Sequence, residues 1–510
     1  MNAHALALLV ALPLLGAVAS YAARDLSAAR RAAAAATALL LAATAALSLA
    51  LWAKGWPTLD QVGPTVPGLH ARWHLRLDGL TAPFLPLAAF LAAALVVGSP
   101  RRDMSRPALV AIQLSLAGAV LSYLAYDLAL FAVAWALTMA PADAWLRHAP
   151  DPEGRALGRV YRRLLLASTV PLVASIALVG AARHRLGTPF PFDVDGPALS
   201  AHDQVLPFAL LSLAMIIRKP LFPFHVWLPA LAERSPAALT ATLAGTHLGA
   251  FLVARLAIPM LPDAAHLGLT ALTDVALASA LYASFVGLSQ RDLKRAVGYV
   301  WASQLGLVMV GLCGASEESL HGAMLQMAGS SVTLTALSLV ASAVHARYGT
   351  SDVRRLGGLI HRHPVLGAAF FLLSGATIGM PGSLQFVSED LLLHGLLHRH
   401  PFVAAALLVV TAFNGVTLLR LFFDAFYGAP RDPSILSPET RDVMPRERIV
   451  VAGVLGLVLA GGLVAQPLLD ARAAAVRQLA DAAAAAHEAA GAHGVSDGHS
   501  ASGAPSAAPR

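Results

Sequence analysis

The stretch RKPLFPFH, at residues 218–225, interrupts an apolar run that extends from about residue 204 to residue 224. Proline removes an amide hydrogen and clashes with the preceding turn, so a helix cannot continue through such a stretch. A second interruption, GMPG at residues 379–382, lies in a later apolar run. We expect each run to form a broken helix. The breaking residues are Pro220, Pro223, Pro381 and Gly382.

The composition of the chain is that of a membrane protein. Of its 510 residues, 57% are hydrophobic and only 13% are charged, roughly half the charged share of a soluble domain. Because a soluble protein cannot bury so much apolar surface, a soluble enzyme is excluded. The apolar runs are long and continuous, which predicts transmembrane helices and not a β-barrel. The single cysteine, Cys313, excludes a disulfide framework and a cysteine-ligated metal site.

Charged residues and Pro/Gly breaks divide the chain into fourteen candidate transmembrane segments. They lie near residues 3–22, 32–53, 79–98, 108–125, 127–146, 160–182, 204–224, 237–258, 266–288, 296–313, 319–344, 364–393, 401–427 and 449–469. The first has no charged flank before it and is followed by another long apolar run, which predicts a retained helix and not a cleaved signal peptide. The predicted fold class is therefore an all-α polytopic membrane protein with about 14 transmembrane helices.

The basic residues predict how these segments are oriented. With the N-terminus outside, the seven inside loops and the helix ends next to them carry 23 Lys and Arg, and the outside loops and both tails carry 9. Because Lys and Arg concentrate on the cytoplasmic side, both termini are predicted to be periplasmic, in a bacterial inner (cytoplasmic) membrane. The same bias explains the net charge of +7 without a nucleic-acid partner.

The two interruptions occupy corresponding places in two sets of five segments, near residues 108–258 and 266–427. A repeat of five spans is odd, so the second copy is inverted relative to the first. Paired broken helices in inverted repeats are typical of ion paths in transporters; the alternative is a pair of packing kinks. Residues 1–470 form the predicted transmembrane domain. Residues 471–510 are predicted to be an Ala-rich helix followed by a disordered tail.

Several ionisable residues lie at membrane depth, where each costs roughly 2.5–3.5 kcal/mol on insertion scales. Lys219 lies at the first interruption, His247 in the eighth segment and Glu389 after the second interruption, and all three side chains can titrate. Arg218 stays protonated and tunes its neighbours. Asp274, in the ninth segment, either supports the path or pairs with a basic group. A lone buried histidine is often structural, but the three titratable residues together predict an ion path.

Four motifs carry a family resemblance. PFHVWLP at residues 223–229 resembles the P-x-H-x-W-L-P signature of the antiporter-like membrane subunits. That family includes proton-pumping subunits of respiratory complex I, Mrp-type sodium/proton antiporters and membrane hydrogenases. Residues 292–306, DLKRAVGYVWASQLG, are similar to D-x-K-R…Y-S-x-x-S-Q-x-G. Residues 352–359, DVRRLGGL, resemble D-x-R-x-L-G-G-L, and residues 379–389 resemble G-x-P-G…F-V-x-E.

The resemblance implies a half-channel in each repeat, joined by a hydrated line of charged residues. In the family, a Glu on the fifth segment pairs with a Lys on the broken seventh, and a Lys or His on the eighth passes the proton inward. Counting back from the tryptophan of the first motif places Arg218 at the seventh-segment position, although Lys219 titrates more readily. His247 matches the eighth-segment position, and Glu389 matches the acidic end of the second half. The supporting residues are His225, Asp274 and Lys294.

Two departures from the family pattern are visible. The usual W-E of segment five reads Trp135-Ala136 here, which removes the carboxylate partner. The usual H-A-x-x-K-A of segment eleven reads SVTLTA at residues 331–336, which removes the central relay. Thr335 and Ser331 can hold water but cannot store a proton charge.

These features favour a proton- or sodium-translocating subunit of a multi-subunit, complex I-like assembly. One alternative is the ion-coupled membrane subunit of a DAB-type inorganic-carbon (bicarbonate or CO₂) uptake complex, since relay loss fits a changed coupling role. Another is a non-conducting structural scaffold. No nucleotide-binding, metal, quinone or nucleophile motif is legible, so we expect no cofactor, no metal and no catalytic site in this chain. Expected partners are other membrane and peripheral subunits, H⁺ or Na⁺, and the lipid bilayer.

Overall fold

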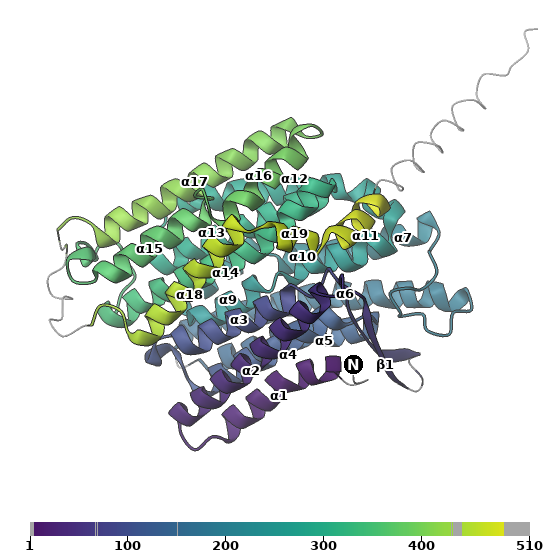
Figure 1. Ribbon diagram of the computed structural model, residues 1–510, viewed down its shortest axis with the longest axis horizontal. Coiled ribbons are helices and arrows are strands. Elements are labelled where there is room, and N and C mark those ends of the chain that lie inside the picture. The colour runs from purple at the N-terminus through teal and green to yellow at the C-terminus, as the bar shows by residue number, and fades with distance from the viewer. Residues whose placement is uncertain are drawn as a thin grey trace, which may run out of the picture.

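The computed structural model describes residues 5–66, 68, 70–149, 151–429, 431 and 441–483. These residues form a helical bundle with one two-stranded hairpin (Figure 1). Within these ranges, ten helices are long and apolar enough to cross a membrane, so the chain is an all-α integral membrane protein, as predicted. Residues 473–483 are helical, as expected for the Ala-rich segment. The predicted disordered tail, residues 489–510, lies outside the described residues, as do residues 484–488 of the Ala-rich segment.

The first three helices are α1 (Ala5–Ala22), α2 (Leu26–Trp52) and α3 (Phe84–Gly98). The carboxylate of Asp25 caps α2 by accepting a hydrogen bond from the backbone of Ala28. Helix α1 packs against α2 and α4, and α2 packs against α3. These helices therefore form one side of the bundle.

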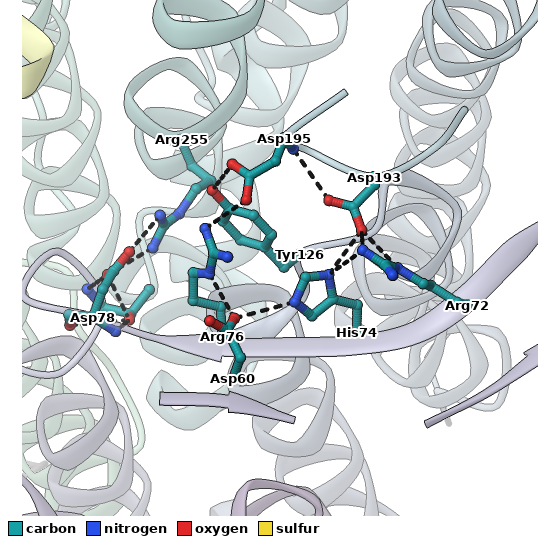
Figure 2. A network of polar contacts seen from close by, with 10 residues as sticks. Asp60, Arg72, His74, Arg76, Asp78, Tyr126, Asp193, Asp195 and Arg255 are labelled. Carbon is teal, nitrogen blue, oxygen red and sulfur yellow. Dashed lines mark hydrogen bonds and ion pairs between the residues drawn. The ribbon is translucent and has the colours of Figure 1, made fainter. Parts of the chain in front are cut away.

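Between α2 and α3 the chain forms an antiparallel hairpin of β1 (Leu59–Val66) and β2 (Ala71–Leu77), at one end of the bundle (Figure 1). The sequence analysis assigned no strand here. Figure 2 shows why the hairpin is ordered. His74 of β2 lies between two carboxylates, with Nε2 3.1 Å from Asp60 Oδ1 and Nδ1 2.8 Å from Asp193 Oδ2. Because Asp193 belongs to the loop after α6, these contacts fix the hairpin to a segment more than 100 residues away.

Three further contacts extend this network around the hairpin (Figure 2). The Arg76 guanidinium lies 3.7 Å from the centroid of the Tyr126 ring, and the Tyr126 hydroxyl donates to Asp195 Oδ1 at 2.7 Å. The Arg255 guanidinium donates to both oxygens of Asp78, at 2.6 and 2.8 Å. A bidentate pair of this kind fixes geometry as well as charge, so the network also holds the end of the eighth segment.

The first set of five segments begins with three continuous helices and ends with two interrupted ones. Its elements are α4 (Arg106–Leu124), α5 (Leu128–Arg147), α6 (Pro152–Arg185), α7 (Ala201–Arg218), a 3₁₀ turn η2 (Phe224–Val226), α8 (Trp227–Arg234), α9 (Ala237–Gly245), α10 (Leu248–Leu252), a π-helical turn η3 (Val253–Ala257) and α11 (Ile258–Met260). Helix α7 stops at the first predicted interruption.

The second set contains one interrupted segment, between α15 and α16. Its elements are α12 (Pro262–Gly287), α13 (Leu293–Cys313), α14 (Glu317–Tyr348), a 3₁₀ turn η4 (Leu359–His361), α15 (Pro364–Thr377), α16 (Leu384–Leu397) and α17 (Pro401–Phe426). Helix α18 (Pro445–Leu463) and the short α19 (Gln466–Asp470) follow. Ser383 caps α16 by accepting a hydrogen bond from the backbone of Phe386, so the second interruption ends where a new helix begins.

The eighth segment differs from the prediction of one continuous helix. His247 adopts a left-handed backbone conformation, with φ of 48°, between α9 and α10. Left-handed non-glycine residues are uncommon and often occur at functional sites. The π-helical turn η3 follows α10. The bundle therefore contains a third interruption, centred on one of the predicted path residues.

Candidate ion path

The first interruption leaves backbone groups that require new partners. Pro220 and Pro223 have no backbone N–H to donate, so α7 cannot continue beyond Lys219. The freed backbone is partly satisfied by neighbours: Leu221 N donates to Ile216 O at 3.1 Å, and Phe222 N donates to the Ser279 hydroxyl of α12 at 2.8 Å. In a membrane such replacements are required wherever a helix breaks.

Lys219 and His247 meet directly where two interruptions come together. The Lys219 Nζ atom lies 2.8 Å from His247 Nδ1, and both residues are about 2% exposed. A hydrogen bond between two nitrogens needs one proton between them, and two adjacent cations at this distance would repel. The pair can therefore hold a shared proton and can accept or release another.

From His247 a series of buried polar side chains leads into the second set of segments. His247 Nε2 lies 3.4 Å from the Ser330 hydroxyl, which donates to the backbone carbonyl of Gln326 at 2.5 Å, one turn earlier in α14. The Gln326 side chain donates to Gln304 and accepts a hydrogen bond from Ser388. All of these serine and glutamine side chains are fully buried. We name this series, Lys219, His247, Ser330, Gln326 and Ser388, the polar line.

Glu389 follows the last member of the polar line in the sequence and lies beside the second interruption. Its Oε2 atom accepts a hydrogen bond from the Thr411 hydroxyl of α17 at 3.3 Å. Its Oε1 atom is buried and has no hydrogen-bond partner within the described part of the chain. A Cβ atom added at Gly379 would lie 3.0 Å from Oε2. The interruption therefore makes the room that this carboxyl group occupies.

Arg218 does not join the polar line. Its guanidinium lies 4.5 Å from the centroid of the Trp135 ring, and Nη2 donates to the Thr138 hydroxyl at 2.6 Å. Nη1 is buried and has no partner among the described residues. Ala136 lies between these two contacts in the sequence, where the family resemblance leads one to expect a glutamate. Arg218 thus faces the fifth segment without a carboxylate, while Lys219 turns to His247.

The three predicted supporting residues lie in three different places. His225 is buried at the first interruption, and its ring packs edge-on against Tyr282 with centroids 4.7 Å apart. Lys294, near the start of α13, donates to the Ser235 carbonyl at 2.9 Å. Asp274 is exposed on α12 and forms no hydrogen bond with the other described residues. The structure therefore does not bring these three into the polar line.

Lys294 lines a cavity of about 1170 Å³ at the end of the bundle opposite the hairpin. Asp103, between α3 and α4, lies in the same cavity. Burial raises the pKa of Asp103 above its ordinary value, and the nearby Lys294 and His345 only partly oppose this shift. This carboxyl group therefore keeps its proton at a higher pH than a solvated aspartate does.

Ser330 and Gln326 are not among the predicted path residues, because neither side chain titrates. Their spacing of four residues places both on one face of α14, and a buried glutamine in an apolar helix was the available signal. The two hydroxyl groups at the segment-eleven departure have different surroundings. The Thr335 hydroxyl is buried and has no partner within the described residues, whereas the Ser331 hydroxyl donates to the Gly245 carbonyl at 2.6 Å.

Comparisons with known proteins identify the family. The family model described as "NADH:quinone oxidoreductase/Mrp antiporter, TM" matches residues 125–414, more than half of the chain. Subunit M of the NADH-quinone oxidoreductase of Pseudomonas aeruginosa is 26% identical over 464 residues, which covers 85% of this chain and 90% of that protein.

Solved structures show the same fold. A chain of respiratory complex I from Thermus thermophilus superposes with a TM-score of 0.84 at 24% identity, over 94% of this chain and 99% of that one. A chain of the Mrp complex from Dietzia superposes with a TM-score of 0.79 at 20% identity, over 96% and 99%. The predicted resemblance is thereby confirmed, and the chain belongs to the NADH:quinone oxidoreductase/Mrp antiporter membrane family.

Proposed function

We propose that this chain is a proton-translocating membrane subunit of a multi-subunit assembly like complex I or the Mrp complex. The observation that carries the proposal is the polar line, in which buried side chains and the Gln326 backbone carbonyl connect the two sets of segments. Buried polar groups in a membrane are costly, and a series that continues across the bundle is hard to explain by packing alone. The names of similar proteins, subunits of NADH-quinone oxidoreductases and of Mrp complexes, agree with this role.

The proposal includes the topology. The ten long helices, together with α3, the α7–α8 pair, the α15–α16 pair and α18, make fourteen spans, with inverted repeats near residues 108–258 and 266–427. Residues 1–470 form the membrane domain of a bacterial inner-membrane protein with both termini periplasmic. This orientation places the cavity that holds Lys294 and Asp103 on the cytoplasmic side and the hairpin on the periplasmic side.

Each path residue then has a role. The Lys219–His247 pair stores and passes a proton, because its two nitrogens share a hydrogen bond. Arg218, permanently charged, sets the potential around that pair. Glu389 is the acidic terminus of the second half, and the open position on its Oε1 suits a proton or a water molecule. The breaking residues at both interruptions leave space and unpaired backbone for water.

The chemistry of the polar line favours H⁺ over Na⁺ as the transported ion. Hard metal cations prefer oxygen ligands, whereas the first half of the line presents the nitrogens of Lys219 and His247 beside Arg218. A metal cation would be repelled by these positive groups, but a proton is exchanged between them. The ion is tested by measuring flux with and without sodium.

The decisive experiment measures proton flux in vesicles that contain this chain with its co-purified partners. Lys219→Ala and Glu389→Gln are expected to reduce the coupled flux by at least about tenfold, since each removes a group that stores a proton. Glu447→Gln is the matched control, because Glu447 is a buried carboxylate that pairs with Arg347 and lies outside the path. Flux in both path variants equal to that of the control variant would refute the proposal.

The expected glutamate is absent at Ala136 and the expected central relay is absent at Thr335. These losses favour two other candidate functions. A non-conducting scaffold predicts full assembly but no flux that depends on Glu389. A DAB-type inorganic-carbon uptake subunit predicts flux together with a single large zinc protein as the co-purifying partner. Mass spectrometry of the complex isolated in mild detergent separates redox subunits from a zinc protein.

A further inference from the structure

One face of α12 presents exposed residues from Leu267 to Phe285. The helix packs against α13, α7 and α17, and between α7 and α17 it presents a row of exposed residues spaced three or four apart, which places them on a single side of the helix. The row consists of Leu267, Ala271, Asp274, Ala278, Tyr282 and Phe285. We name it the α12 stripe.

Asp274 lies at the centre of the α12 stripe and of the helix. It is about 18 Å from Pro262 and about 20 Å from Gly287 at 1.5 Å per residue, so it is near the middle of the bilayer. In the ten long apolar helices of the described chain, Asp274 is the one acidic or basic residue that is exposed within four residues of a helix midpoint. It forms no hydrogen bond or ion pair within the described residues.

Contact with lipid is unfavourable for this carboxylate. A charged residue at mid-membrane disfavours insertion by roughly two orders of magnitude. Three other charges inside the predicted spans, Arg218, Lys219 and Arg255, are buried. The exposed Asp390 of α16 has a partner, His394, at 3.4 Å. The exposed position of Asp274 therefore indicates that another molecule covers it.

We propose that the α12 stripe is the docking face for a transmembrane helix of a partner subunit that carries a Lys or Arg at mid-membrane depth. The inference rests on the proposed function, since it needs an assembly. A cation on the partner neutralises Asp274 where no lipid headgroup reaches. Ala271 and Ala278, one turn to each side, let the partner backbone approach closely, as small residues do at membrane helix contacts. Tyr282 and Leu267 pack beyond them.

A second copy of this chain is a worse occupant. A two-fold contact through the same stripe would place Asp274 near its own copy, and two carboxylates in a dry interface repel. The charge on the stripe therefore requires a different chain with the opposite charge.

Photo-crosslinking tests the occupant directly. A photoreactive amino acid at Ala271 or Ala278 leaves Asp274 in place and is introduced into the full complex in native membranes. We expect a crosslink to one partner subunit, mapped by mass spectrometry to a helix that contains a Lys or Arg. Crosslinks only to lipid, or only to a second copy of this chain, would overturn the proposal.

Substitution of the carboxylate separates charge from packing. Asp274→Leu is expected to insert at least as well as the native chain, since it removes a charge from a lipid-accessible position, yet to lower recovery of the crosslinked partner about tenfold or more. Asp274→Glu keeps the charge and should keep the partner. Equal recovery in all three chains overturns the charge pairing.

The result is distinguishable from failure of the proposed function. If the native chain conducts protons with its partners but gives no crosslink from the α12 stripe to any of them, this inference fails and the ion path stands. If the stripe crosslinks to a basic partner helix but flux is independent of Lys219 and Glu389, the docking face stands and the conduction proposal fails. If no partner co-purifies at all, the docking proposal is refuted.

Discussion

Ser330→Ala is the sharpest perturbation of the proposed path, because Ser330 is the bridge between its halves. Its hydroxyl lies 3.4 Å from His247 Nε2 and donates to the Gln326 carbonyl at 2.5 Å. Removing one oxygen atom leaves a gap of up to about 6 Å between that nitrogen and the carbonyl, well beyond hydrogen-bond reach. The site is fully buried and closely packed, so a water molecule does not replace the hydroxyl without displacing neighbours.

The adjacent Ser331 provides a matched control. Both serines are fully buried, and the Ser331 hydroxyl also lies 2.6 Å from a carbonyl one turn earlier, Met327 O, as well as 2.6 Å from Gly245 O. Ser331→Ala and Ser330→Ala should therefore each lower the free energy of unfolding by about 1 kcal/mol. Only Ser330→Ala removes a contact to His247. If that contact lowers the proton-transfer barrier by about 1.4 kcal/mol, its loss reduces the flux about tenfold.

The assay is proton flux in vesicles with the partner subunits present, and thermal unfolding in detergent is measured on the same preparations. The expected result is equal loss of stability in both variants and loss of flux in Ser330→Ala alone. Equal flux in the two variants would show that protons do not cross at Ser330, and the polar line would then be a structural network. A larger loss of stability in Ser330→Ala would also count against the role of Ser330, since unfolding alone would then explain the lower flux.

Three other perturbations test separate parts of the structure. Gly379→Ala adds a Cβ at φ of +74° and 3.0 Å from Glu389 Oε2, so we expect a loss of roughly 1–2 kcal/mol in the free energy of unfolding, measured by thermal unfolding. Arg255→Leu leaves the carboxylate of Asp78 without its bidentate partner and should cost about 3 kcal/mol, part of which Asp78→Asn in the same chain restores. Burial raises the pKa of Asp193, but hydrogen bonds from its histidine and arginine partners outweigh this and hold the pKa below its ordinary value. The stabilisation is therefore present above about pH 3.9 and is lost as pH falls through the lower folded-state pKa, which hydrogen exchange of the hairpin should report.

The two proline interruptions were predictable because their cause is local. Proline ends a helix wherever it lies in one, so RKPLFPFH and GMPG predict breaks without knowledge of any neighbour, and α7 and α15 end there. The same stretches place Lys219 and Glu389 at membrane depth. What the residues alone left open was which of Arg218 and Lys219 faces the eighth segment, since adjacent residues on a helix point about 100° apart.

The features that were not predicted depend on contacts made by distant parts of the chain. The residue at the third break, His247, is neither proline nor glycine. Its left-handed backbone accompanies the contact with Lys219, 28 residues away. Ser330 and Ser331 differ by one position, so only the rotation of α14 decides which meets His247. The hairpin residue His74 is ordered by Asp193, 119 residues later. The depth of Asp274 in the membrane predicts a residue of the ion path, but the packing of α12 places its side chain on the outside of the bundle.

The departures from the family pattern are consistent with an ion path in which different residues hold the proton. With Ala136 in the fifth segment, a titratable residue facing it would have no carboxylate partner, and that position is held by Arg218 over an aromatic ring. The titratable lysine is shifted by one residue and meets His247 directly. Between that pair and Glu389, the polar line consists of neutral hydroxyl and amide groups. A hydroxyl can both donate and accept, so it passes a proton without holding a charge. Such a bridge transfers protons only when its two ends differ in charge. Conduction therefore depends on the charge of the Lys219–His247 pair. A partner subunit that changes this charge would control conduction.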